Sequence, residues 1–309
     1  MLAILGGLGA ALCWATSSMA AARSARLIGS WATVGWVMSI GVLIAVPATI
    51  VGGAGANLTT DALTLLGISG VSNVVGLLLA YTAFKAGKVA VIAPIISTEG
   101  AMGAAISIAL GERVGIAAAI VLTAIAIGVI LASSGRDEAA VAEPGGLATA
   151  PDAPGPTAPG PEAIALGPGH PGRRATLIAV AAALAFGINL YASARLGATL
   201  PLVWSILPAR LGGFLFVALP LLLSGRLRLT RGALPFVALV ALTEIVGTGV
   251  FAFGARDGIA VAAVTSSQFG AIAAVVSVVA FGERLRRTQV VGIVAIAVGV
   301  ALLAEIQSR

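Results

Sequence analysis

Ten apolar runs of about 20 residues follow one another along this chain, each bounded by charged residues, Gly, Pro or Asn. An α-helix of that length crosses the hydrocarbon core of a bilayer. The expected helices cover residues 2–20, 29–51, 62–84, 89–110, 114–133, 175–194, 200–223, 233–254, 259–280 and 288–305. The chain is therefore expected to be an all-α membrane protein with ten transmembrane helices.

The composition excludes a soluble globular domain. Hydrophobic residues make up 59% of the 309 residues, charged residues only 10%, and the mean hydropathy is +1.08. A soluble domain carries about 25% charged residues, whereas in lipid apolar side chains can face outward. We expect a multi-pass protein of the cell (inner or plasma) membrane, with membrane lipid around it. No basic segment precedes the first run, which predicts a retained helix rather than a removed signal peptide.

The net charge of +6 does not predict a nucleic-acid partner. The Lys and Arg residues occur in ones, twos and threes between apolar runs, which is typical of membrane loops and not of a continuous phosphate-binding face. Loops after odd-numbered runs, together with the long central segment, carry thirteen of the eighteen Lys and Arg residues, and the opposite side carries four. The positive-inside rule therefore predicts cytoplasmic odd-numbered loops and external termini.

Residues 134–174 interrupt the apolar pattern. This segment contains eight of the fourteen prolines and eight glycines, and it has little apolar material to bury. Such a composition predicts a disordered linker. The expected domains are thus a five-helix unit at 1–133, a linker at 134–174 and a second five-helix unit at 175–309.

The two five-helix units repeat each other. The tripeptide at 111–113 (Gly-Glu-Arg) recurs at 282–284, and the segment at 124–129 (AIAIGV) recurs at 295–300 (AIAVGV), both with an offset of 171 residues. Because five is odd, the second unit must cross the membrane in the opposite sense to the first. Inverted-topology repeats are typical of secondary transporters.

At these residues the sequence resembles the drug/metabolite transporter superfamily, and specifically its ten-helix EamA-type members. The matching features are the repeated Gly-Glu after the fourth and ninth helices, paired glycines in the fifth and tenth, and Pro94 within the fourth. The resemblance implies metabolite or drug transport, often efflux, with a substrate cavity between the halves. Two features depart from it. Residues 264–265 (Val-Thr) stand where a proline would mirror Pro94, which predicts a straighter ninth helix, and such proteins place both termini in the cytoplasm, so the orientation stays open.

Three ionisable side chains fall near the middle of expected helices: Glu99, Arg210 and Glu244. A charge at mid-membrane depth is costly, so these side chains should face a cavity or each other. Arg210 could bind a substrate carboxylate, pair with a glutamate until substrate displaces it, or simply fix helix register in a buried pair. Glu99 and Glu244 are candidates for proton coupling, because a carboxyl group removed from water takes up a proton more readily. Asn73 stands 171 residues before Glu244, so polar groups occupy equivalent positions in both halves.

Other polar and aromatic residues within the expected helices could line a mixed pocket or merely pack between helices. They are Trp14, Tyr81, Asn189, Tyr191, Trp204 and Gln268. Glu112 and Glu283 differ, since each stands at a helix end beside an arginine. Capping or loop folding explains both without substrate contact.

The sequence lacks the signals of an enzyme or a cofactor protein. No glycine loop leads into a Lys-Ser/Thr pair, which argues against direct ATP driving. No nucleophile–base pairing is visible, so no catalytic residue is assigned. The only histidine, His170, lies in the linker, so neither a metal nor another cofactor is expected. Cys13 is the only cysteine, which excludes an intramolecular disulfide.

Together these features predict a secondary active transporter of a small organic metabolite or drug-like solute, working by alternating access with proton coupling and acting as an exporter. The alternatives are a lipid-handling protein or flippase and a non-transporting membrane scaffold. A cavity opening sideways to lipid would favour the lipid handler, and the absence of a midplane cavity would favour the scaffold. Monomer and homodimer are both compatible with the sequence.

Overall fold

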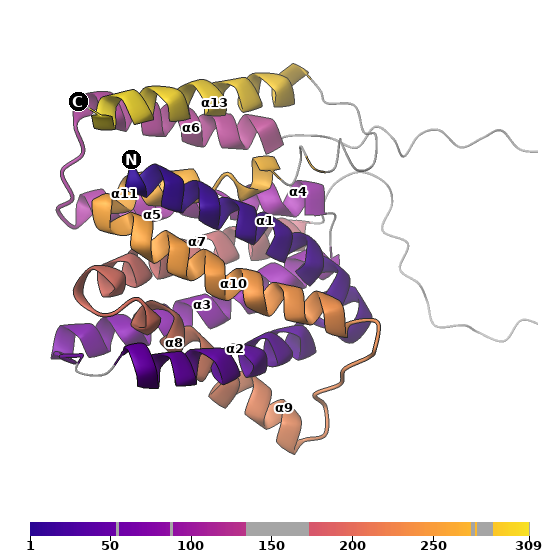
Figure 1. The fold of residues 1–309 in the computed structure, drawn as a ribbon. Coiled ribbons are helices and arrows are strands. Elements are labelled where there is room, and N and C mark those ends of the chain that lie inside the picture. The colour runs from indigo at the N-terminus through magenta and orange to yellow at the C-terminus, as the bar shows by residue number, and fades with distance from the viewer. Residues whose placement is uncertain (54–55, 87–88, 134–172, 273–275, 277–286, 309) are drawn as a thin grey trace, which may run out of the picture. The chain divides into compact units, whose positions relative to one another are not determined.

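The regular structure of the described chain is entirely helical (Figure 1). The computed structural model describes all residues except 54–55, 87–88, 134–172, 273–275, 277–286 and 309. The first half forms α1 (Leu2–Ile28), α2 (Ser30–Gly52), α3 (Thr60–Ala86), α4 (Val89–Ile96), α5 (Glu99–Ala109) and α6 (Ile116–Ser133). The second half forms α7 (Arg173–Thr199), α8 (Val203–Gly213), the π-helical η1 (Phe214–Ala218), α9 (Leu219–Leu223), α10 (Leu234–Gly254), the 3-10 turn η2 (Ala255–Asp257), α11 (Ile259–Ser266) and α13 (Arg287–Ser308).

Six helices in the described chain are long and apolar enough to cross a membrane. They cover Leu2–Ile28, Ser30–Gly52, Thr60–Ala86, Arg174–Thr199, Val203–Leu223 and Leu234–Asp257, and two shorter apolar helices cover Ile116–Gly128 and Ile259–Ile272. The chain is therefore a multi-pass membrane protein whose described part is all-helical.

Several sequence predictions fall on residues outside the described part. These are most of the linker at 134–174, His170 within it, and the second Gly-Glu-Arg tripeptide at 282–284 with Glu283.

The fourth and ninth apolar runs are each broken by a two-residue turn, at 97–98 and at 267–268. The second break shows that the expected straighter ninth helix was wrong, since α11 ends there without any equivalent of Pro94. The cause is local. The hydroxyl groups of residues 265–267 each donate a hydrogen bond of 2.8 to 3.0 Å to a carbonyl three or four residues earlier. Such bonds compete with the backbone amides for the same carbonyls and bend or end a helix.

Helix α1 packs along α10, and the two run antiparallel (Figure 1). Near the start of α1, a Cβ added to Gly6 would lie 2.6 Å from the Cα atom of Gly254 at the end of α10. Further along α1, the Ser17 hydroxyl donates a 2.7 Å hydrogen bond to the Glu244 carboxyl group, which lies earlier in α10. Small residues at such a contact let two backbones approach closely, which is how membrane helices gain packing energy.

The contact between α3 and α7 mirrors that between α1 and α10. The hydroxyls of Ser69 and Ser193 are 3.0 Å apart, and further along α3 the ring of Phe186 fills the space beside Gly76. The two helices therefore also run antiparallel. These two helix pairs, α1 with α10 and α3 with α7, form most of the wall of the cavity described below.

Three more pairs join the halves: α2 with α8, α5 with α11, and α6 with α13. In the last pair, which lies together at one side of the bundle (Figure 1), Gly128 faces Ile296 and Gly299 faces Ile125. The earlier residue of α6 thus meets the later residue of α13, so these helices are antiparallel. The contacts of α2 with α8 and of α5 with α11 follow the same antiparallel order.

Candidate functional site

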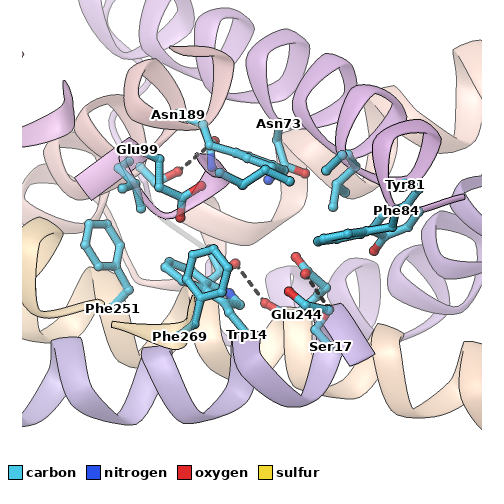
Figure 2. Close-up of a pocket in the computed structure, with 18 residues that line it drawn as sticks. Trp14, Ser17, Asn73, Tyr81, Phe84, Glu99, Asn189, Glu244, Phe251 and Phe269 are labelled. Atoms are coloured by element: carbon cyan, nitrogen blue, oxygen red, sulfur yellow. Dashed lines mark hydrogen bonds between the residues drawn. The ribbon is translucent and has the colours of Figure 1, made fainter. Parts of the chain in front are cut away.

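A cavity of about 590 Å³, measured with the space at its mouth, lies between α1, α3, α7 and α10, with the break between α4 and α5 and the segment after α11 completing its wall. Figure 2 shows polar and aromatic side chains turned into it from several helices. Nine lining residues carry polar side chains: Ser17, Ser18, Asn73, Tyr81, Glu99, Asn189, Ser193, Glu244 and Thr248. An apolar and aromatic wall with a few convergent polar groups is typical of a small-molecule site.

Helical periodicity brings these side chains to the cavity. On α3, Asn73 and Tyr81 are eight residues apart, so both lie on one face of the helix with Phe84 close by. On α10, Glu244 and Thr248 are four residues apart and share a face in the same way. One face of each helix therefore supplies the lining, and the other faces are left for packing or lipid.

Glu244 is the centre of a buried polar cluster. Its carboxyl group accepts the 2.7 Å hydrogen bond from Ser17, and its Oε2 atom lies 3.6 Å from an Nη atom of Arg210 on α8. The Arg210 side chain is only 1% exposed, and its other Nη atom lies 3.8 Å from the sulfur of Met38. The pair therefore joins α10, α8 and α1, and Arg210 supplies its positive charge to Glu244 from behind the cavity wall.

Glu99 differs from Glu244 because it has no partner among the described residues. It begins α5, directly after the break that follows α4, and it is 5% exposed. No hydrogen bond or ion pair reaches its carboxyl group within the described chain. Figure 2 shows Glu99 on a different wall from Glu244, with its carboxyl group turned into the cavity.

Buried polar atoms around the cavity are also left without partners. Among the described residues, the Oδ1 atom of Asn73 and the hydroxyl of Tyr81 make no hydrogen bond. Buried polar groups nearly always find a partner, so a ligand or water in the cavity would be well placed to satisfy them. Asn189 is already engaged, because its Oδ1 atom accepts hydrogen bonds from Ser69 at 3.0 Å and Ser193 at 3.2 Å.

The structure brings six of the ten predicted site residues to the cavity wall: Trp14, Asn73, Tyr81, Glu99, Asn189 and Glu244. Arg210 lies behind the wall through its ion pair with Glu244. Gln268 is buried beside the lining residue Phe269 but does not line the cavity itself, and its amide nitrogen has no partner within the described chain.

Tyr191 and Trp204 lie away from the cavity lining. The Trp204 indole donates a 3.2 Å hydrogen bond to the carbonyl of Gly53 and packs with Leu196 and Leu200. It therefore joins the end of α2 to the start of α8.

Sequence reasoning missed twelve of the eighteen lining residues, eight of them apolar and four with hydroxyl side chains. The unpredicted residues are Ser17, Ser18, Leu77, Ala80, Phe84, Ile96, Phe186, Leu190, Ser193, Thr248, Phe251 and Phe269. Steps of three and four residues from the predicted polar positions would have found several of them, such as Leu77 from Asn73 and Ser193 from Asn189.

Glu112 has the structural role that was predicted for it. Its carboxyl oxygens lie 3.0 and 3.2 Å from the backbone nitrogen of Ala260, which donates from the first turn of α11, and the Ser107 hydroxyl also donates to it. A carboxylate is favourable at a helix N-terminus because it accepts from amides that have no helical partner. Glu112 thus ties the end of α5 to the start of α11 in the other half. Gly111 before it has a φ of +104°, a conformation that favours glycine.

The described residues contain no cluster of three or more His, Cys, Asp or Glu side chains that could hold a metal ion.

Comparison with known proteins agrees with these features. Residues 1–134 match the EamA-like transporter family. No curated protein matches the chain. Twenty-seven chains of solved structures match. One crystal structure aligns with a TM-score of 0.69 and 18% identity over 99% of this chain and 98% of its own, a likeness that shows the fold alone. The resemblance to the EamA-like transporters is thereby confirmed over residues 1–134 of this multi-pass membrane protein.

Proposed function

We propose that this protein is a secondary carrier of a small organic solute, built from two inverted five-helix repeats and working by alternating access in the cell membrane. The observation that carries the proposal is the cavity, because helices of both halves form it and both contribute polar groups. From the first half come Trp14, Asn73 and Glu99, and from the second half Asn189 and Glu244. A site placed between two units can be exposed to either side when one unit rocks against the other.

The positions of the helices support the repeat at 1–133 and 175–309, joined by the linker at 134–174. Helix α1 ends at Ile28 and α7 ends at Thr199. The two helix ends are 171 residues apart, which is the offset of the sequence repeat.

The packing of the helices supports an inverted arrangement. Exchanging the halves turns the α1–α10 contact into the α7–α3 contact, and both are observed. The pair formed by Gly128 and Ile296 becomes the pair formed by Gly299 and Ile125, which is also observed. Equivalent helices such as α6 and α13 run antiparallel, as ten successive crossings of the membrane require.

Within this carrier, the ion pair of Arg210 and Glu244 positions α8 against α10, and Glu99 and Glu244 are the candidates for proton coupling. The direction that we propose is export. The cavity's unpartnered atoms on Asn73 and Tyr81 would bind the solute.

Transport can be tested with a variant that fills the cavity. Thr248 lines it, and within the described chain its hydroxyl donates only to the carbonyl of Glu244 in its own helix, at 2.8 Å. Thr248→Phe should therefore block the cavity with little other loss. The matched control is Val246→Phe on the same helix, where the side chain is 51% exposed. Proteoliposomes would be loaded with a mixture of amino acids, amines, nucleosides and organic acids, and the efflux of each compound followed by mass spectrometry.

Wild-type and Val246→Phe vesicles should release at least one compound faster than protein-free vesicles, and Thr248→Phe vesicles should not. Equal retention of every compound in all four preparations would refute the carrier.

Inverted topology can be tested with single cysteines introduced into a Cys13→Ala background. Leu27 near the end of α1 and Ala198 near the end of α7 are both exposed and are 171 residues apart. A membrane-impermeant maleimide should label Leu27→Cys and Ala198→Cys from opposite faces of sealed vesicles. Labelling of both from the same face would overturn the inverted repeat.

A further inference from the structure

We infer that the cavity binds a small organic cation that carries an apolar or aromatic group, with Glu99 as its counter-charge. This inference rests on the proposed function, because it names the class of solute that the carrier would take.

The charges in the cavity wall are unbalanced. Two carboxyl groups line the cavity, and among the described residues no lysine, arginine or histidine lines it. Arg210 offsets the charge of Glu244 from behind the wall at 3.6 Å. Glu99 has no such partner in the described chain, although it is 5% exposed. An isolated carboxylate removed from water is unfavourable. A cationic ligand would supply the positive charge that the described chain does not place beside Glu99.

Aromatic rings form an unusually large part of the same wall. Six of the eighteen lining side chains are aromatic, whereas aromatic residues make up 5% of the chain. They are Trp14, Tyr81, Phe84, Phe186, Phe251 and Phe269. The faces of such rings attract cations, with tryptophan the strongest, and the attraction grows when water is excluded. Trp14 and Phe251 already pack with ring centres 5.8 Å apart in a tilted arrangement, and Figure 2 shows Trp14, Phe269 and Glu99 around the same space.

An anionic ligand fits this wall poorly. Arg210 would be its natural partner, but that side chain is 1% exposed and is held against Glu244. A ligand carboxylate would have to displace Glu244 or lie near Glu99 without a counter-charge. A neutral ligand would leave the Glu99 carboxyl group without a counter-charge. The arrangement therefore selects for positive charge, and the rings select for an apolar substituent.

The test compares three ligands of similar size and different charge: benzyltrimethylammonium, benzyl alcohol and phenylacetate. Binding to the purified full-length protein in detergent is measured by isothermal titration calorimetry. Wild-type protein should bind the cation at least about tenfold more tightly than either other ligand, and Glu99→Gln should weaken cation binding by about tenfold or more, as expected for loss of one charged partner. Trp14→Phe, which keeps a ring face, should weaken it less than Trp14→Leu.

The matched control is Asp61→Asn, which removes a carboxyl group from the exposed first turn of α3 and should leave binding unchanged. Equal binding of the three ligands, tighter binding of phenylacetate, no binding of the cation, or unchanged cation binding in a folded Glu99→Gln variant would each overturn the inference. The efflux assay separates this failure from that of the carrier. If the cation site fails but Thr248→Phe blocks the efflux of a neutral or anionic compound, the carrier is supported without the cation site. If the cation binds but no compound is released, the cation site is supported and transport is refuted.

Discussion

The ion pair between Arg210 and Glu244 makes a quantitative prediction about stability. Glu244→Gln keeps the shape of the side chain and an oxygen that can accept from Ser17, so the main change is the loss of the negative charge 3.6 Å from the guanidinium group. Arg210 is then left 1% exposed with no acidic partner in the described chain. An unpaired arginine at mid-membrane depth costs about 2.5–3.5 kcal/mol, and breaking a buried ion pair by removing one partner costs about 3–5 kcal/mol. We therefore expect the free energy of unfolding to fall by about 3 kcal/mol.

The double variant Arg210→Met/Glu244→Gln distinguishes this cost from a general loss of packing. It removes both charges and places an apolar side chain beside Met38, so it should recover most of the lost stability. Unfolding of the wild type, both single variants and the double variant in mixed micelles, followed by tryptophan fluorescence as denaturing detergent is added, measures the coupling energy between the two positions. A coupling below about 0.5 kcal/mol would refute the reasoning, because two groups that do not interact give additive effects.

Two further predictions concern contacts between the halves, both read from thermal unfolding in detergent. Gly254→Ala should destabilise the protein by about 1–3 kcal/mol, because the added Cβ would lie 2.8 Å from the Cα atom of Gly6, whereas Gly249→Ala on the same helix meets only an ordinary contact at 3.6 Å and should have little effect. Equal effects of the two would contradict the close approach of α1 and α10. Glu112→Ala should cost about 1 kcal/mol by removing the cap of α11, while Glu112→Gln, which keeps an acceptor for the amide of Ala260, should cost less. Indistinguishable variants would argue against the cap.

The helical architecture was predictable because each apolar run must satisfy its backbone polar groups within itself in lipid. The residues at which the helices end were less predictable. The first run was expected to end at residue 20, but α1 continues to Ile28, since a helix can extend past the apolar segment through Arg23 and Arg26. The break after α11 was missed because it depends on hydroxyl groups competing for carbonyls, a signal weaker than proline.

Four of the eighteen lining residues followed from one rule, that a charged or amide side chain at mid-membrane depth must face protein. Asn73, Glu99, Asn189 and Glu244 obey it and line the cavity. The rule could not tell that Arg210 would lie behind the wall, because lining a cavity and pairing with a neighbour satisfy the charge equally well. Phe186 and Phe269 could not be predicted as lining residues, because the rule does not apply to apolar side chains. Lipid and protein interior are both apolar, so a phenylalanine carries no signal of which it faces.

The sequence by itself determined that this protein lies in a membrane as helices, and it predicted that the two halves repeat each other. It also determined which few polar groups must be shielded from lipid, because hydrocarbon penalises an unsatisfied backbone or charge wherever it occurs. Only the tertiary structure decided which carboxyl group was neutralised and which was left facing a wall of rings. That outcome depends on contacts between residues far apart in the chain, such as Arg210 with Glu244, which no local pattern encodes.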